Sequence, residues 1–395
     1  MARILIAWEL GAGFGHITRL LAIAGALKAR GHRPFLALSN LVETWPAYRS
    51  TSYPILQSPM YQRPPGPRRR LRTASLTDIL ALCGFLNADE LLAMVRAWER
   101  LIDAVRPGAI VADYSPTLSL AAFGAHPLVA IGDGFTLPPH DLPTFPALQP
   151  RIHGLEREER MLEVVRRVQR ARRRPQPEAM PQIFAARAQF VCTLPELDPY
   201  RAWRDRPAEG AFEPLPKPAP PAAGPGFFAY LAADARFIAT AVRGLAEAPV
   251  KGRFFIRRAP GNMKRLLAER GHHVYDRPAP IQAVLREVPA IVHHGGIGTT
   301  EIALALGRPQ LLFPRHLEQQ LTATALVKLG VGISLGGKFT QAQVIEALRR
   351  LLEDRRFARR AQAFAARLAK RKQRDNVARI ADACAEIAMD GALPH

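Results

Sequence analysis

The chain has 395 residues and is 48% hydrophobic, which favours two domains with sizeable cores. Its formal net charge of +21 raises nucleic-acid binding as a possibility, but that class rests on charge alone, since no aromatic residues interleave with the basic ones and no known nucleic-acid motif occurs. No apolar run reaches about 18 residues, and the widely separated Cys83, Cys192 and Cys384 lack metal-ligand spacing. This argues against a membrane span, a disulfide framework and a structural zinc, and fits a reducing cytoplasm.

The N-terminal segment is typical of the opening of a doubly wound α/β domain. A buried strand is predicted at 3–8, then a Gly-rich turn at 11–16 that ends in His16, a helix at 17–30 and a second strand at 34–38. The first strand runs straight into the turn with no small-residue cleavage site, which favours a strand over a signal peptide.

The remaining elements of this half alternate in the same way. They are a Pro- and Arg-rich stretch at 59–73 interpreted as a mobile loop, a helical stretch at 76–105, a strand at 109–112 that ends at Asp113, a strand at 128–131, a very basic helix at 155–174, and a last strand at 190–193.

The clearest linker is the Pro-rich segment 214–226, whose composition predicts a semi-rigid spacer. The alternation then restarts, and predicts a second α/β domain. Its elements are strands at 227–231, 252–257 and 272–275, helices at 234–247, 262–270 and 280–287, and terminal helices at 340–353 and 355–389.

The segment 291–319 carries most of the candidate ligand-binding residues. A short apolar run ends at two histidines, a Gly-rich turn leads into an Ala/Leu-rich helix, and a second apolar run ends at a proline. The polar and glycine residues of this pattern are His293, His294, Gly295, Gly296, Gly298, Thr299, Glu301, Glu318 and Gln319.

A Gly-rich turn before a helix presents unpaired N–H groups and the positive end of the helix dipole, which suits a phosphate. Glycines also let the main chain approach a ligand closely. His293 and Thr299 can add donors, while Glu318 and Gln319 follow the next strand, where an open α/β sheet binds its ligands. The spacing by itself leaves an ordinary loop equally open.

The whole string resembles the donor-binding signature of the nucleotide-sugar glycosyltransferases that include the macrolide enzymes, the plant secondary-metabolite enzymes and the UDP-glucuronosyltransferases. The matching residues are His293, Gly295, Gly298, Glu301, Gly307-Arg308-Pro309, and Pro314 through Glu318-Gln319. The resemblance implies the GT-B architecture, two Rossmann-like α/β domains that face each other across a cleft.

The resemblance also implies the domain organisation. An acceptor-binding domain is expected at 1–213, with the helix from about 375 to 395 packing back on it. The Pro-rich linker at 214–226 is followed by a nucleotide-sugar-binding domain at 227–374.

By the same resemblance His16 is the catalytic base and Asp113 holds its second nitrogen, as in a triad that lacks its own nucleophile. Two other readings stay open from the residues alone. His16 could cap the helix that it begins or bond a backbone carbonyl. Asp113 could be the N-cap of a helix that starts at Ser115.

In the second half the resemblance assigns His293, Gly298 and Thr299 to the diphosphate, Glu301 to the ribose, and Glu318-Gln319 to the donor sugar. His294 is expected to be structural or peripheral. The remaining donor-binding residues are Gly15, Gly295 and Gly296.

Three positions depart from the family pattern. Pro278 stands where an aromatic residue often stacks on the nucleobase, Leu231-Ala232-Ala233 replaces a Gly-Thr or Gly-Ser strand end, and Glu318 replaces the commoner Asp. The implied activity is an inverting, metal-independent transfer of a hexose from a UDP or dTDP sugar to a hydroxyl of a small or lipid-like acceptor. No cofactor, metal or nucleic-acid partner is expected, and the location expected is cytoplasmic.

Two alternatives remain. One is a MurG-like enzyme acting on a lipid-linked acceptor at the inner membrane face, with 155–174 and 59–73 on anionic lipid. The other is a nucleotide-sugar-binding protein or epimerase of the same fold that performs no transfer.

Overall fold

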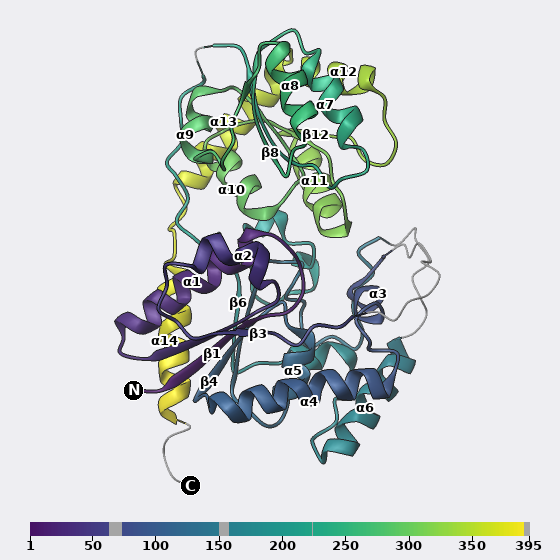
Figure 1. Ribbon diagram of the computed structural model, residues 1–395, viewed down its shortest axis with the longest axis vertical. Coiled ribbons are helices and arrows are strands. Elements are labelled where there is room, and N and C mark those ends of the chain that lie inside the picture. The colour runs from purple at the N-terminus through teal and green to yellow at the C-terminus, as the bar shows by residue number, and fades with distance from the viewer. Residues whose placement is uncertain (63–72, 150–157, 223, 391–395) are drawn as a thin grey trace. The chain divides into compact units, whose positions relative to one another are not determined.

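A computed structural model of the chain describes residues 1–62, 73–149, 158–222 and 224–390. It divides into two compact units, Met1–Glu213 with Asp375–His395, and Pro214–Arg374. Within the described residues each unit is built around one six-stranded sheet whose paired strands are all parallel, with helices on its faces (Figure 1). The predicted fold class of two Rossmann-like α/β domains is therefore confirmed. Most of the loop predicted at 59–73 and the start of the basic helix at 155–157 lie outside the described residues.

The first sheet has the strand order β3-β2-β1-β4-β5-β6. Its strands are β1 (Arg3–Trp8), β2 (Arg33–Leu38), β3 (Ile55–Gln57), β4 (Ala109–Asp113), β5 (Leu128–Gly132) and β6 (Ala188–Val191). The central strands are buried on both faces, which explains their continuous apolar runs. In the register of β1 with β4, Trp8 lies opposite Asp113.

The helices of the first unit cover this sheet. They are α1 (Phe14–Ala29), α2 (Leu41–Tyr48), α3 (Leu76–Ala81), α4 (Ala88–Val105), α5 (Pro116–Ala122), α6 (Glu158–Arg172) and α14 (Asn376–Asp390), with short 3₁₀ turns at Met180–Phe184, Pro195–Leu197 and Arg201–Trp203. The last helix of the chain, α14, belongs here because its apolar face, including Ile380, Cys384 and Ile387, packs in one core with Ile4 and Leu20.

The helical stretch expected at 76–105 is broken into α3 and α4. Gly84 between them has a φ of 88°, and a Cβ at this position would lie 2.9 Å from the ring of Tyr61. Asn87 then caps α4 by accepting the N–H groups of Asp89 and Glu90. The apolar side chains keep their helical spacing from α3 to α4, although the backbone turn at Gly84 separates the two helices.

Helix α6 is as basic as the sequence predicts, but its apolar side is occupied. Met161, Val165 and Val168 are buried within the first unit. Contact of α6 with anionic lipid would therefore rest on its exposed charged side chains. No helix among the described residues combines the length and the apolar character that a membrane span requires.

The second sheet has the strand order β12-β11-β10-β7-β8-β9. Its strands are β7 (Phe227–Ala232), β8 (Gly252–Arg257), β9 (His273–Val274), β10 (Ile291–His293), β11 (Gln310–Leu312) and β12 (Gly332–Ser334). Its helices are α7 (Ile238–Ala246), α8 (Gly261–Glu269), α9 (Ile281–Glu287), α10 (Ile297–Ala305), α11 (Leu317–Leu329), α12 (Gln341–Glu353) and α13 (Arg355–Ala369).

The Pro-rich segment is anchored to the second unit through a buried arginine. The side chain of Arg308 donates to the carbonyls of Leu285 (2.6 Å), Pro220 (2.8 Å) and Arg286 (3.2 Å). Leu285 and Arg286 are in the last turn of α9, whose carbonyls have no partner within the helix. One guanidinium thus closes a helix end and holds the linker against it, which explains an arginine that is only 1% exposed.

We predict that Arg308→Met lowers the stability of the second unit by about 3 kcal/mol, because it leaves buried carbonyls without donors. Differential scanning calorimetry measures this change. Arg286→Met is the matched control, since the Arg286 side chain is exposed and its loss is expected to cost less than about 0.5 kcal/mol. Equal losses in the two variants would contradict the assignment of Arg308 as a clamp.

Candidate active site

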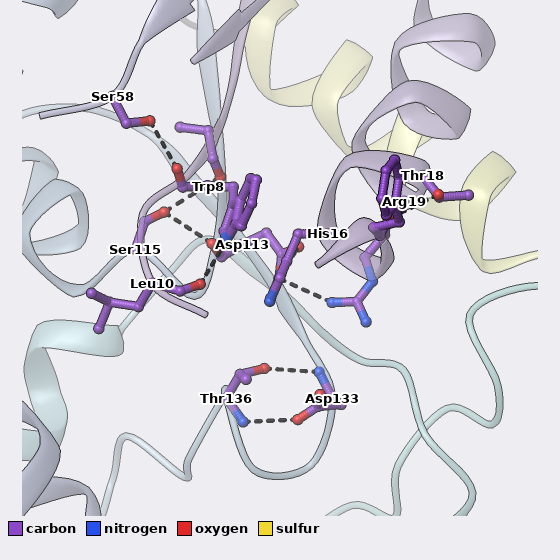
Figure 2. A network of polar contacts seen from close by, with 12 residues as sticks. Trp8, Leu10, His16, Thr18, Arg19, Ser58, Asp113, Ser115, Asp133 and Thr136 are labelled. Carbon is purple, nitrogen blue, oxygen red and sulfur yellow. Dashed lines mark hydrogen bonds and ion pairs between the residues drawn. The ribbon is translucent and has the colours of Figure 1, made fainter. Parts of the chain in front are cut away.

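The carboxyl edge of the first sheet brings His16 and Asp113 together (Figure 2). The chain leaves β1 through a turn in which Gly11 and Gly13 have φ values of 92° and 93°. Side chains other than glycine rarely adopt such values. Helix α1 begins immediately afterwards, so His16 lies in its first turn, above the end of β4.

The two side chains form a hydrogen bond of 2.9 Å between His16 Nδ1 and Asp113 Oδ2. An ionised carboxylate only accepts, so Nδ1 carries the proton and Nε2 keeps its lone pair. Asp113 is fully buried, whereas the His16 side chain is 14% exposed. The arrangement therefore fixes the orientation of the imidazole, with Nδ1 on the carboxylate and Nε2 directed away from it.

Aromatic rings and a glycine fix the plane of this imidazole. The Trp8 ring stacks on it, with centroids 5.0 Å apart and planes 12° from parallel, and the Tyr114 ring is 6.4 Å away. A Cβ on Gly11 would lie 2.5 Å from His16 Nε2, so only glycine leaves space for the ring.

Arg19 is the residue of this site that the sequence interpretation missed. It is one turn after His16 on α1, and its Nη1 donates to Asp113 Oδ1 at 2.9 Å. Burial by itself raises the pKa of Asp113, but the charge of Arg19 and the hydrogen bonds from His16 and Arg19 more than compensate, and the pKa lies below its usual range. The i, i+3 spacing of His16 and Arg19, which places them on one helix face, is the signal that could have found it.

The two simpler readings of this pair are not what the structure shows. No side chain caps α1, so His16 is not its cap. The N-terminus of α5 is bonded by Glu9 rather than by Asp113, since Glu9 accepts from Thr117 N (3.0 Å) and Thr117 Oγ1 (2.8 Å). Burial raises the pKa of Glu9 to about 7.

In the second unit the Gly-rich turn follows β10 and leads into α10. Gly295 has a φ of 92°, and Gly296 is the N-cap of a helix that no side chain caps. A Cβ on Gly296 or Gly298 would have no neighbour within 4 Å. The start of α10 thus has no side-chain cap and has free space beside both glycines, which suits an anion at a helix N-terminus. Thr299 is half-buried in the same first turn.

Both ring nitrogens of His293 and both of His294 form hydrogen bonds within the protein. His293 donates from Nε2 to Gln310 Oε1 at 2.8 Å and accepts the N–H of Gly295 at Nδ1, at 3.1 Å. His294 accepts the N–H of Ala232 at 3.0 Å and donates to the carbonyl of Phe313 at 2.9 Å. In this geometry His293 holds the turn in shape, and His294 joins the ends of two strands.

The other residues predicted to bind the sugar donor lie on helices α10 and α11. Glu301 is buried in α10. Glu318 and Gln319 begin α11 instead of lying in a loop, and the Gln319 side chain accepts from Arg315 N at 3.0 Å. A Cβ on Gly295 would lie 3.1 Å from the Gln319 carbonyl oxygen, so the Gly-rich turn and the start of α11 are in contact.

The described residues contain no group of three or more His, Cys, Asp or Glu side chains that could hold a metal ion. Gly15 lies in the first turn of α1, next to His16, with no neighbour within 4 Å of a built Cβ. The roles assigned to individual residues from the sequence stay predictions.

Comparison with solved structures identifies the fold. The spinosyn rhamnosyltransferase SpnG has a TM-score of 0.67 at 18% identity, over 98% of this chain and 100% of SpnG. Structures of SpnG complexed with spinosyn aglycone and with thymidine diphosphate also match, with TM-scores of 0.65 and 0.61. The fold is therefore that of the GT-B glycosyltransferases.

The sequence match is concentrated in the second unit. Residues 273–384 match the family model for the erythromycin biosynthesis protein CIII-like C-terminal domain. Glycosyltransferase GtfE of Amycolatopsis orientalis is 41% identical over 56 residues, a segment that spans 14% of its length and 14% of this chain. Elloramycin glycosyltransferase ElmGT of Streptomyces olivaceus is 44% identical over 54 residues, again 14% of each chain. The resemblance to the macrolide-type glycosyltransferases predicted from the sequence is confirmed.

We predict that Gly11→Ala destabilises the first unit by about 1–3 kcal/mol, because its φ is strained for alanine and its Cβ would collide with His16. Gly25→Ala is the matched control. Gly25 is exposed on α1, and alanine there is expected to raise the free energy of unfolding by about 0.5–1 kcal/mol. Thermal melts measure both changes, and a Gly11→Ala variant as stable as the parent would refute the close contact with His16.

We predict that the second unit loses stability as the pH falls from about 6.5 to about 4. Burial lowers the pKa values of His293 and His294 from 6.5 to about 4. The unfolded chain therefore binds more protons than the folded chain in this window, and acidification favours unfolding.

Thermal melts at a series of pH values test this expectation with two variants. His294→Gln should show a weaker loss of melting temperature on acidification, and His273→Gln, at an exposed position, is the control. If both variants kept the parental dependence on pH, His294 would not be a source of it.

Proposed function

We propose that the chain is an inverting, metal-independent glycosyltransferase that moves a hexose from a UDP or dTDP sugar to a hydroxyl of a small-molecule acceptor. The observation that carries the proposal is the pairing of His16 with buried Asp113, which leaves Nε2 of a neutral imidazole available as a base. The similarity to the glycosyltransferase GtfE and to SpnG, whose structures were obtained with spinosyn aglycone and with thymidine diphosphate, supports the substrate classes.

In the proposed reaction the acceptor hydroxyl gives its proton to His16 Nε2 as its oxygen attacks the anomeric carbon of the sugar. The bond from that carbon to the diphosphate oxygen breaks, and the diphosphate leaves with the electron pair. A single displacement of this kind inverts the anomeric configuration. The imidazolium that forms is stabilised by the Asp113 carboxylate and by the stacked Trp8 ring.

The Gly-rich turn of the second unit is suited to the leaving group. The N–H groups at the start of α10, the dipole of that helix and the Thr299 hydroxyl would meet the charge that develops on the diphosphate. His293 then contributes by holding Gly295 in its left-handed conformation, and not by direct contact, since both of its ring nitrogens are engaged. Glu301 is proposed for the ribose, and Glu318 and Gln319 for the sugar hydroxyls.

We predict that His16→Ala reduces transfer by about 10²–10⁴-fold, the usual contribution of a general base. The assay uses UDP, dTDP and GDP sugars with a panel of hydroxyl acceptors, and includes hydrolysis of the donor. Thermal shifts with the same sugar nucleotides should be equal in His16→Ala and the parent, because the proposed nucleotide site lies on the second unit.

His273→Ala, at an exposed position, is the control for His16→Ala. Equal transfer rates in His16→Ala and the parent would remove the base assignment. A sugar nucleotide that raises the melting temperature without any transfer or hydrolysis would instead favour the binding protein or epimerase of the same fold.

A further inference from the structure

The carboxylate of Asp113 has two partners, one on each oxygen. His16 Nδ1 lies 2.9 Å from Oδ2, and Arg19 Nη1 lies 2.9 Å from Oδ1. Both partners come from successive turns of α1, as Figure 2 shows. The carboxylate therefore cannot rotate without breaking one of the two bonds.

The guanidinium of Arg19 is itself held in place. Its Cζ lies 5.3 Å from the centroid of the Phe212 ring, and its side chain is 12% exposed beside an Asp113 that is fully buried. An arginine stays charged at every pH at which the protein is folded. Solvent screens this charge poorly, because the surroundings are mostly protein.

We infer that Arg19 is a positioning residue of the proposed reaction, which orients the Asp113 carboxylate and, by sharing its charge, keeps the His16 imidazole in the unprotonated form that a base requires. The inference rests on the proposed function. Arg19 and a protonated His16 compete for the charge of the same carboxylate. A carboxylate paired with the imidazole alone would stabilise the imidazolium strongly, whereas a carboxylate that already neutralises a guanidinium stabilises the imidazolium less.

The other groups near His16 do not supply this effect. The rings of Trp8 and Tyr114 face the imidazole, and the indole favours its protonated form. The nearby carboxylates are bonded elsewhere. Glu9 accepts from Thr117 and Leu118, and Asp133 accepts the N–H groups of Phe135 and Thr136.

The test is a titration of the histidine ring resonances by NMR in protein labelled at histidine. The His16 resonance is identified by its loss in His16→Gln. In Arg19→Met the pH of half-protonation of His16 is expected to rise by about one pH unit. Arg19→Lys keeps the charge and is expected to stay near the parent, and Lys28→Met, which removes a cation from the far end of the same helix, is the matched control.

Arg19→Gln gives a second measurement, because it keeps a donor toward Asp113 without the charge and should shift the midpoint as Arg19→Met does. A midpoint equal to the parent in both charge-removing variants would overturn the inference. The titration needs no substrate, so it gives a result even if no transfer activity is found. Where transfer is measurable, the acid limb of kcat/KM should move to higher pH with the midpoint, whereas a purely structural role would lower activity at every pH alike.

Discussion

The first unit depends on one carboxylate that is removed from water. Asp113 ends a central strand, and without partners its burial would cost more than a small domain can tolerate. The partners come from α1, so the hydrogen bonds that satisfy Asp113 also fix where that helix begins. The left-handed glycines before α1 and the glycine contact with the imidazole follow from the same requirement. A change at Asp113 would therefore affect both the stability of the first unit and the proposed proton transfer.

In the second unit, the neutral rings of His293 and His294 form the buried polar contacts at the end of β10. Two consecutive histidines end β10, and each uses one ring nitrogen as a donor and the other as an acceptor. A neutral imidazole can do both, and protonation would remove the acceptor. The turn that follows is thereby held by neutral rings, and the positive end of α10 adds attraction for an anion.

Much of this architecture could be predicted from the sequence. Buried parallel strands give continuous apolar runs, and Gly-rich turns before helices mark their carboxyl ends, so two α/β domains followed from the alternation, and the family resemblance implied the GT-B architecture. The break at Gly84 and the helix that starts at Leu317 could not be predicted, because hydrophobic periodicity reports which face is buried and not where the backbone turns.

The site was predictable in part for a similar reason. The roles of His16 and Asp113 were implied by the resemblance of the 291–319 segment to a family, and their residue types are those that proton transfer needs. Arg19 and Glu9 belong to no sequence motif. Their roles depend on which carboxylate or helix end lies beside them, and the order of the strands in the sheet brings these partners together from about a hundred residues away in the chain. The predicted contact of His293 with the diphosphate stays a prediction, and both of its ring nitrogens have hydrogen-bond partners within the protein, which sequence spacing does not reveal.

The assignment of α14 to the first unit has a consequence for the order of synthesis. The first unit is discontinuous in sequence, and its core is incomplete until residues after Asp375 have been added. The second unit, Pro214–Arg374, is continuous, and all of its strands and helices have been translated by then. During synthesis the second unit can therefore fold before the first unit, whose core lacks the apolar side chains of α14 until the end of translation.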